Sequence, residues 1–313
     1  MAGSILITGI SGYIGGSIPS AILDGQSNEY FQLDISALVR SNSQAAAVDR
    51  LAGVHSVTVK AFDELDRLEE LGEQFDSTLI TYAVIIILIY QRCDSPTNWD
   101  SYNSRRCRMA HGLAKAFVNG LSKRRAAGKK GHYNQIFGTS NLSDRPHSAN
   151  FVEMRTFSED EDIYSYEKSR EAKEHNVLTC IVMAPTIFGL GTGPFNKWSV
   201  QLPAIIADAL QSQHVKVIGG GQTAWSRVHI EDLTDLFVLL VRRIVNADVR
   251  NMSLLEGAGA LRDAFRAELS FGANLGWKPS REGEWAGSFA KELKEYAHNK
   301  PQPKALPRIM RKK

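Results

Sequence analysis

The sequence predicts an α/β fold, in which helices cover a parallel sheet. The first observation behind this fold class is the stretch 5–16 (ILITGISGYIGG). There a branched apolar run with the length of a buried strand breaks into glycines and then continues at helical spacing. The second is that short apolar runs and amphipathic segments alternate between residues 5 and 190, as in successive βαβ units. A chain of 313 residues, 43% of them hydrophobic, can bury such a core.

The glycines of the opening stretch each have a physical task in a nucleotide-binding turn. Gly9 allows the tight turn, Gly12 lets the backbone approach a pyrophosphate, and Gly15 lets helix and strand pack closely. The helix N-terminus that follows offers N–H groups and the positive end of its dipole to phosphate oxygens. A glycine-rich turn without a ligand is the alternative, and it is disfavoured because three glycines cost conformational entropy. Pro19, beyond the first turn, predicts a kink in this helix.

Residues 8–15 read Thr-Gly-Ile-Ser-Gly-Tyr-Ile-Gly and match the pattern T-G-x-x-G-x-x-G throughout. Here the sequence resembles the extended short-chain dehydrogenase/reductase superfamily, the NAD(P)-dependent epimerase/dehydratase-like proteins. The resemblance implies a Rossmann-type doubly wound parallel sheet with a smaller C-terminal substrate lobe. It also implies a nicotinamide dinucleotide as cofactor, with Tyr13 and Ile14 joining the three glycines in its site. It extends over roughly residues 3–83, 131–245 and 276–296.

The elements expected after the first helix alternate in the same way. Strands are expected at residues 31–39, 57–59, 78–83 and 133–137 and from residue 177, and helices at residues 43–52, 65–75 and 111–125. The apolar run 79–90 is shorter than the roughly 20 residues of a membrane-spanning helix, so it is interpreted as a buried, over-long strand. Residues 84–90 are bulky where the superfamily has small residues, and residues 91–108 match no expected element.

Residues at the end of the second strand distinguish NADP from NAD. An acidic side chain there binds the ribose 2′-OH and favours NAD, whereas an arginine accommodates a 2′-phosphate and favours NADP. Arg40 ends this strand and is followed by Ser41 and Asn42, so NADP is predicted. Asp34 would favour NAD, but it falls early in the strand rather than at its carboxyl end. The other alternative is that Arg40 is simply a surface residue.

The resemblance implies further cofactor contacts along the chain. Asp63, after the third strand, corresponds to an acidic residue that faces the adenine, and Ala83 ends the fourth strand in the cofactor wall. Residues 184–189 (APTIFG) match the motif after the sixth strand, which implies that Pro185 and Ile187 lie beside the nicotinamide. Ala184 departs from the arginine that often precedes this proline.

Three residues are candidates for catalytic proton transfer. The resemblance implies a catalytic hydroxyl after the fifth strand, where Ser140 is the best match and Thr139 the second. Tyr164 and Lys168 are four residues apart, so they share one face of a helix, and a nearby ammonium lowers a tyrosine pKa from its usual value near 10. The interval from residue 140 to residue 164 is similar to that of the superfamily.

A second interpretation of these candidates stays open. Only residues 164–176 remain for the crossover helix before the next strand, close to the minimum of about a dozen residues that such a connection needs. Either the tyrosine lies at an unusual depth, or Tyr164 and Lys168 belong to an exposed loop and are inert. For Ser140 and Thr139, the alternative role is capping of a loop.

The chain is expected to divide into a cofactor domain and a substrate lobe. Residues 1–190, with 220–245 returning to them, form the first; residues 191–219 and 246–298 form the second; residues 299–313 form a basic, disordered tail. In the lobe, Asn196, Ser199 and Gln201 are candidates for substrate contact, with loop hydrogen bonding as the alternative.

Two further positions in this part of the chain bear on the predicted catalytic residues and substrate class. His229, in a motif that resembles V-H-V-x-D, is expected to be a packed strand residue. Enzymes of the superfamily that act on nucleotide sugars usually have an arginine where this chain has Trp225, and Arg227 is expected on the opposite strand face, so that substrate class is disfavoured.

Composition excludes several other classes of function. The net charge of +3 is too small to predict nucleic-acid binding, and the basic runs, such as 123–125, are interpreted as solvated surface. Three cysteines without metal-ligand spacing predict no metal site and a reducing compartment. The first strand begins too early for a signal peptide. We therefore expect a cytoplasmic protein with a small-molecule substrate and no membrane partner; a homodimer is left open.

These features predict an NADP-dependent oxidoreductase or epimerase/dehydratase-like enzyme that acts on a small carbonyl or hydroxyl compound. Hydride transfer at the nicotinamide would be coupled to proton transfer by Ser140, Tyr164 and Lys168. NAD is the less favoured cofactor. The alternative is a catalytically silent NAD(P)-binding sensor or scaffold protein, suggested by the short crossover and the bulky residues 84–90. A third reading is an irregular gene model at residues 84–108 and 172–176.

Overall fold

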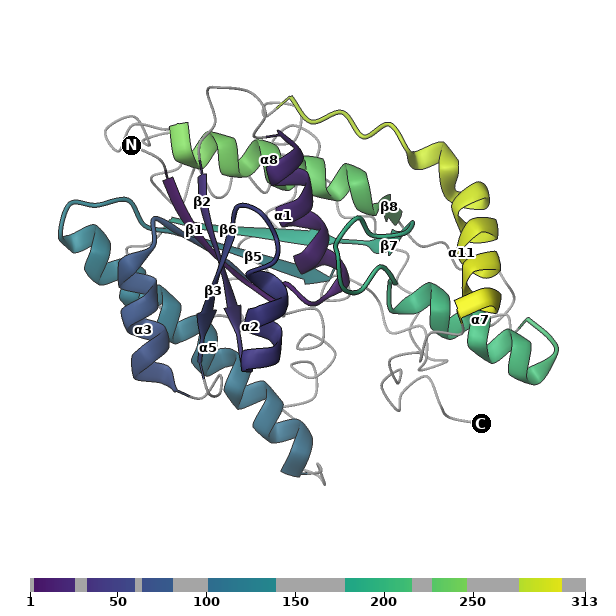
Figure 1. Cartoon of the computed structure of the whole chain (residues 1–313), viewed down its shortest axis with the longest axis horizontal. Coiled ribbons are helices and arrows are strands. Elements are labelled where there is room, and N and C mark those ends of the chain that lie inside the picture. Colours follow the sequence, from purple (N-terminus) through teal and green to yellow (C-terminus); the bar gives the residue numbers. More distant parts are fainter. Residues whose placement is uncertain are drawn as a thin grey trace, which may run out of the picture.

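The computed structural model of the protein describes residues 3–25, 33–59, 64–80, 101–138, 178–215, 227–246 and 276–299 (Figure 1). The strands are β1 (Gly3–Thr8), β2 (Leu33–Val39), β3 (Val54–Thr58), β4 (Ser77–Ile80), β5 (His132–Gly138), β6 (Leu178–Ala184), β7 (Thr186–Phe188) and β8 (Arg227–His229). The helices are α1 (Tyr13–Gly25), α2 (Asn42–Val48), α3 (Leu65–Gln74), α5 (Ser101–Ala126), α7 (Gln201–Ser212), α8 (Ile230–Asn246) and α11 (Trp285–Asn299), with a 3₁₀ turn η4 (Glu282–Glu284).

The described strands form a six-stranded sheet in the order β3-β2-β1-β4-β5-β6, in which every neighbouring pair is parallel. The chain crosses over from β3 to β4, so the order reverses next to β1, as in doubly wound sheets. Strands β7 and β8 form a separate parallel pair. The predicted α/β fold class is therefore confirmed.

Successive residues of β1 show why this strand reads as an unbroken apolar run. Ile5 and Ile7 belong to a core cluster with residues of α1, α2 and α8, whereas Leu6 belongs to a second cluster with residues of α3 and α5. Side chains alternate between the two faces of a strand, so a sheet with helices on both faces needs apolar residues at every position. Figure 1 shows this layered arrangement, with α1 and α8 on one side of the strands and α3 and α5 on the other.

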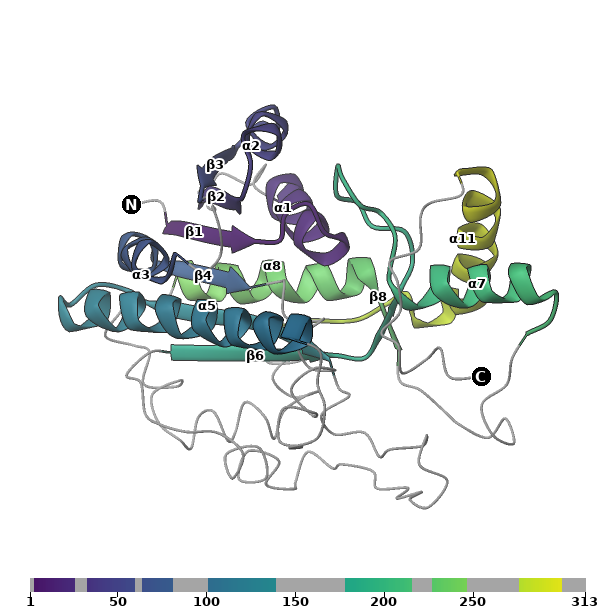
Figure 2. The ribbon, with the colours of Figure 1, turned by 90° about the horizontal axis from the view of Figure 1, so that it is seen from below.

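The register aligns the carboxyl ends of the central strands at one edge of the sheet. Thr8 at the end of β1 is opposite Leu38 of β2 and Ile80 of β4. We call this edge the carboxyl edge, and the edge where β1, β2 and β4 begin the amino edge. Helices α7 and α11 lie beyond the carboxyl edge in both views (Figures 1 and 2). Helix α8 instead packs against α1.

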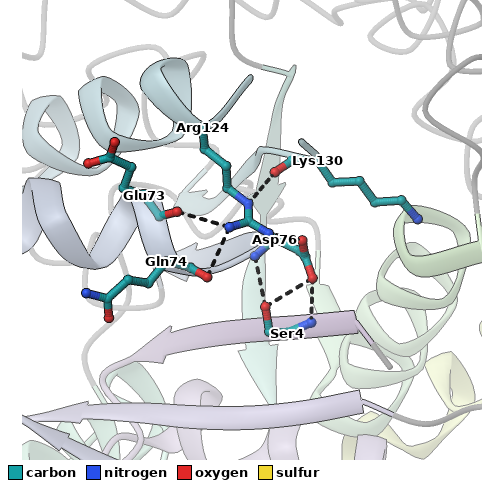
Figure 3. Close-up of polar contacts among 6 residues, drawn as sticks. All are labelled: Ser4, Glu73, Gln74, Asp76, Arg124 and Lys130. Atoms are coloured by element: carbon teal, nitrogen blue, oxygen red, sulfur yellow. Dashed lines mark hydrogen bonds and ion pairs between the residues drawn. The ribbon is translucent and has the colours of Figure 1, made fainter. Parts of the chain in front are cut away.

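At the amino edge, Arg124 from the end of α5 joins three elements (Figure 3). Its Nη1 donates to the carbonyl oxygens of the last two residues of α3, at 3.0 and 3.2 Å, and its Nε donates to the Lys130 carbonyl at 2.7 Å. Its Nη2 pairs with Asp76, whose other carboxylate oxygen accepts from the Ser4 N–H at 2.9 Å and hydroxyl at 3.0 Å. The prediction that the basic run 123–125 is plain solvated surface is therefore wrong for Arg124, whose side chain is only 13% exposed.

Several predicted boundaries are also corrected. The helix before β5 begins at Ser101 rather than at residue 111, and β3 begins at Val54 rather than at residue 57. Helix α2 ends at Val48, where the chain turns through Leu51, whose N–H bonds the Val48 carbonyl. Helix α1 continues through Pro19 to Gly25. The bulky stretch 84–90 and the crossover 164–176 lie outside the described residues.

Candidate functional site

The glycine turn between β1 and α1 has the geometry expected of a phosphate cradle. Gly9 has a φ of 75°, which side-chain-bearing residues rarely adopt, and its carbonyl accepts the Gly12 N–H at 2.8 Å. A Cβ atom at Gly12 would lie 3.0 Å from that carbonyl oxygen, so the turn leaves almost no room for a side chain. Helix α1 begins immediately after it, at Tyr13. Its first-turn N–H groups therefore emerge at the carboxyl edge, where they suit an anionic pyrophosphate.

Glycines also let the loop after β7 approach α1 closely. A Cβ atom at Gly193 would lie 2.6 to 3.0 Å from backbone atoms of Gly16, and one at Gly16 would lie 2.9 Å from the Ile10 carbonyl oxygen. The sequence analysis assigned close packing to Gly15 and missed Gly16. The doubled glycine at 15–16 was the available signal, because a helix gains nothing from two adjacent glycines unless another backbone lies close.

The side chain of Tyr13, a predicted cofactor residue, makes its contacts within the protein. The ring is buried, and the hydroxyl donates to the Gly189 carbonyl at 2.6 Å. Burial, and secondly the charge of Glu292, hold the pKa of Tyr13 well above its usual value. This phenol therefore stays protonated, and what Tyr13 can offer a dinucleotide is its backbone N–H. The side chain of Ile14 is likewise buried in the core around α1.

Asp34 and Arg40, the two residues that could determine the preference for NAD or NADP, lie at opposite edges of the sheet. Asp34 pairs with Ser4 at the start of β1, and its carboxylate lies 3.9 Å from His55. Arg40 directly follows the last residue of β2, is exposed, and lies at the same edge as the glycine turn. Its N–H donates to the Gln44 side chain at 3.1 Å. Asp34 is thus in the wrong place to bind an adenosine ribose at the glycine turn.

The motif 184–189 leads from β6 into β7 at the carboxyl edge. Pro185 is partly buried, and Ile187 is packed into the core around α1, so this strand can present its backbone to a ligand. The Phe188 ring makes edge-on contacts with His229 at 5.1 Å and with Trp285 at 5.0 Å. His229 is 4% exposed and accepts the Glu231 N–H at 3.3 Å, which confirms it as a packed strand residue.

Gly189 is held from two sides. Its φ is 91°, and a Cβ atom there would lie 2.3 Å from Nε2 of His229, so glycine is required. Its carbonyl accepts from Tyr13, and its N–H donates to Oε1 of Glu292 on α11 at 2.8 Å. Glu292 is fully buried, and burial raises its pKa to about 7 against the opposing effect of the Gly189 N–H. Sequence analysis did not identify Glu292.

The C-terminal segment is fixed to α8 just as specifically. The buried Asp232 accepts the Ser280 N–H at 3.1 Å and the Arg281 N–H at 3.0 Å, and its carbonyl accepts from the Trp277 indole at 2.7 Å. The guanidinium of Arg227 lies over the Trp285 ring at 5.4 Å. These contacts bring α11 back to β7 although about a hundred residues of sequence separate them.

The polar candidates of the substrate lobe have different surroundings. Asn196 donates to the Trp198 carbonyl at 3.1 Å and accepts the Trp198 N–H at 3.2 Å, so its side chain serves the loop. Ser199 is buried, and its hydroxyl has no hydrogen-bond partner among the described residues. Gln201 begins α7.

The remaining predicted residues lie outside the described part of the chain. They are Asp63, Ala83, Ser140, Tyr164 and Lys168. Strand β5, which precedes Ser140 in the sequence, ends at Gly138. In the ranges that the structure covers, no group of three or more His, Cys, Asp or Glu could hold a metal ion. No helix within those ranges has the length and apolarity to cross a membrane.

A glycine turn at the carboxyl end of the central strand, feeding a helix in a parallel sheet of this order, defines a Rossmann-type nucleotide-binding protein. The positive φ of Gly9 and the space that a Cβ would fill at Gly12 fit a dinucleotide pyrophosphate.

Comparisons with known proteins agree with this class. Residues 164–253 match the model of the NAD dependent epimerase/dehydratase family. The chain is 23% identical over 287 residues to the oxidase ucsJ of an Acremonium species, covering 83% of this chain and 73% of that protein. The chain is thus similar to this family over residues 164–253, and its sheet order is that of the Rossmann-type fold.

Two solved structures show the same fold at low sequence identity. UDP-glucuronic acid 4-epimerase from Bacillus cereus, in complex with UDP-glucuronic acid and NAD, is 12% identical with a TM-score of 0.57, over 93% of this chain and 99% of that one. Yeast methylglyoxal/isovaleraldehyde reductase Gre2, complexed with NADPH, is 12% identical with a TM-score of 0.52, over 94% of this chain and 99% of that one. The first of these proteins holds NAD and the second NADPH.

Proposed function

We propose that the protein is an NADP-dependent oxidoreductase that acts on a small carbonyl or hydroxyl compound. The observation that carries the choice of NADP is the separation of Arg40 and Asp34. The register puts Asp34 level with Ser4 at the amino edge, whereas Arg40 follows the end of β2 at the edge of the glycine turn. A guanidinium there suits a ribose 2′-phosphate, and no carboxylate from β2 competes for the 2′-OH.

The described residues supply the binding part of the mechanism. The N–H groups at the start of α1 would bind the pyrophosphate, and Arg40 the 2′-phosphate. The backbone of β7, held by the packing of Ile187 and Phe188, would line the nicotinamide pocket. When bound, the nicotinamide supplies hydride chemistry.

Tyr164 is proposed as the general acid or base, with Lys168 lowering its pKa and Ser140 orienting the reacting oxygen. This assignment rests on the sequence motif and on the family match, which begins at residue 164. Tyr13 does not compete for the role, because its hydroxyl is buried and already donates to the Gly189 carbonyl.

Two observations favour a small carbonyl compound over a nucleotide sugar. The position of the usual diphosphate-binding arginine is Trp225 in this chain. The neighbouring Arg227 has its guanidinium over the Trp285 ring of α11. In addition, one protein of similar fold is a methylglyoxal/isovaleraldehyde reductase complexed with NADPH.

The test combines coenzyme binding with turnover. Wild-type protein should enhance NADPH fluorescence at lower concentrations than NADH and should oxidise NADPH with members of a panel of small aldehydes and ketones. Tyr164→Phe should lower kcat by about 100-fold or more, the usual loss when a general acid or base is removed. Tyr166→Phe, two residues further, is the matched control and should retain activity. Preference for NADH, or full activity in Tyr164→Phe, would contradict the proposal.

A catalytically silent NADP-binding protein is the second candidate. Its support is the short interval between Tyr164 and β6, which begins at Leu178. In that case the wild type would bind NADPH normally, yet no carbonyl compound would be turned over.

A further inference from the structure

Glu292 stands out because a carboxyl group is fully enclosed at the point where the C-terminal helix meets the loop after β7. The residue is 0% exposed, whereas Glu295 on the same helix is exposed. Enclosing a carboxyl group is costly unless it serves as a hydrogen-bond partner. The one hydrogen bond described for Glu292 is from the Gly189 N–H to Oε1, and Oε2 has no partner among the described residues.

Gly189 transmits this contact to the glycine turn. The Gly189 N–H donates a hydrogen bond to Glu292, and the Gly189 carbonyl accepts one from the Tyr13 hydroxyl at 2.6 Å. Tyr13 is the first residue of α1 and directly follows Gly12, so its position is tied to that of the phosphate-binding N–H groups. Gly189 also lies so close to the His229 ring of β8 that a Cβ atom would not fit between them, so Gly189 has no room to move toward β8.

A third contact makes the connection rigid. A Cβ atom at Gly191 would lie 2.8 Å from the Ser17 hydroxyl oxygen and 2.9 Å from the Tyr13 ring, so the loop lies directly against α1. The Gly191 N–H also donates to the Lys197 carbonyl at 2.9 Å, which closes the loop on itself. A shift of Gly189 would therefore be passed to Tyr13 rather than absorbed by empty space.

We propose that Glu292 is a positioning residue for the dinucleotide: by holding the Gly189 N–H, it fixes Tyr13 and hence the start of α1 against which the pyrophosphate binds. This inference rests on the proposed function, since it assigns a role at the same coenzyme site. It links a residue of the C-terminal lobe to a turn made by the first sixteen residues. Glu292 itself does not contact the reacting atoms.

The position of an acceptor, rather than a negative charge, is what the proposal requires at residue 292. Glu292→Gln keeps an oxygen at the same reach, so its KM for NADPH should stay within about threefold of wild type. Glu292→Asp keeps the charge but withdraws the oxygen by one methylene, and Glu292→Leu removes the acceptor. Both should raise the KM for NADPH by about tenfold or more, as expected when a buried N–H loses its partner. Glu295→Gln is the matched control on the exposed face of α11 and should change nothing.

The experiment measures NADPH dissociation by fluorescence, and KM and kcat with one aldehyde from the panel, for these variants and for Tyr13→Phe. The KM for NADPH should rise while the aldehyde KM stays nearly constant, whereas a general loss of folded protein would lower the apparent kcat and leave both KM values unchanged. Tyr13→Phe combined with Glu292→Asp should cost less than the product of the separate effects, because both act through Gly189.

Unchanged NADPH dissociation in Glu292→Asp, or fully multiplicative effects of the two substitutions, would overturn the inference. Glu292→Asp and Tyr13→Phe keep the test decisive if Glu292→Leu does not fold. Failure of the wild type to bind either coenzyme would instead overturn the proposed function, so the two failures are distinguishable.

Discussion

The two edges of the parallel sheet use their polar groups in opposite ways. At the amino edge, every interaction described for the Arg124 guanidinium is internal: it bonds Asp76 and three carbonyl oxygens (Figure 3). At the carboxyl edge, the glycine turn ends in the N–H groups of a helix start, and Arg40 is exposed beside it. The arginines at the two edges therefore differ in their surroundings: Arg124 stabilises the fold, and Arg40 is the residue that we propose for binding the 2′-phosphate.

The largest expected effect on coenzyme binding is at the carboxyl edge, in Gly12→Val. The new side chain would begin 3.0 Å from the Gly9 carbonyl and would occupy the space of the pyrophosphate. We expect NADPH dissociation constants to rise by about 100-fold, or about 2.7 kcal/mol, with a retained melting transition. Fluorescence titration measures the first, and thermal unfolding the second. Gly283→Val, at a site with nothing within 4 Å, is the control and should leave NADPH affinity unchanged.

Arg124→Met should do the reverse and lower stability without changing coenzyme affinity. Removing the guanidinium leaves Asp76 and three carbonyl groups without this partner, which should reduce the free energy of unfolding by about 3 kcal/mol. Urea denaturation measures this loss. Lys123→Met removes a neighbouring, largely exposed charge that pairs with Glu69 at 2.6 Å and should cost less than about 1 kcal/mol. Equal losses in both variants would contradict the comparison.

The pH dependence of stability should also differ between the edges. Burial, and secondly the charges of Arg125 and Lys130, lower the pKa of His132 at the amino edge from 6.5 to about 4. Between these values the unfolded chain binds a proton that the folded protein does not, so stability falls as pH drops from 6.5 to 4, by up to roughly 3 kcal/mol. His132→Gln should lose this dependence in urea denaturation over that pH range.

Glu292, at the carboxyl edge, should give a pH dependence of stability opposite in sign to that of His132. Its folded-state pKa of about 7 lies above the ordinary 4.5, so the folded protein holds a proton that the unfolded chain releases. Stability should therefore fall as pH rises from 4.5 to 7, and Glu292→Gln should remove that fall. If neither His132→Gln nor Glu292→Gln changes the pH dependence of stability seen in the wild type, the roles given to both residues are wrong.

The smallest expected effect concerns the choice of coenzyme. Arg40→Ala should weaken NADPH binding by about tenfold, the loss of one charge-assisted hydrogen bond, and should change NADH binding by less than about twofold. Asp34→Asn should change neither, because Asp34 lies at the amino edge beside Ser4 and His55. Parallel titrations with the two coenzymes measure both variants. A shift toward NADPH in Asp34→Asn would restore Asp34 as a ribose ligand.

Local sequence patterns were sufficient to predict those features whose residues follow one another directly in the sequence. The run 5–16 predicted β1, its turn and α1, because the strand, the glycines and the helix start follow one another directly. The place of Arg40 followed from the length of β2. The internal role of His229 followed from a strand motif, and its packing on Phe188 confirms it.

Tertiary contacts decided what the patterns could not show. Glu292 and Glu295 look alike in the sequence, and only the return of α11 to β7 buries the first. Arg124 looked like part of a solvated basic run, but the ends of α3 and α5 meet around it. The assignment of Ser140, Tyr164 and Lys168 stays a prediction, since those residues lie outside the described part of the chain.

The contact between Glu292 and Gly189 also has a consequence for the order of synthesis. The glycine turn emerges from the ribosome first, whereas the carboxyl group that holds its supporting loop emerges almost three hundred residues later. A nascent chain can form the central strands early, but it cannot complete this contact until α11 has been made. Full affinity for the coenzyme should therefore arise only after α11 has been made, later than the central strands.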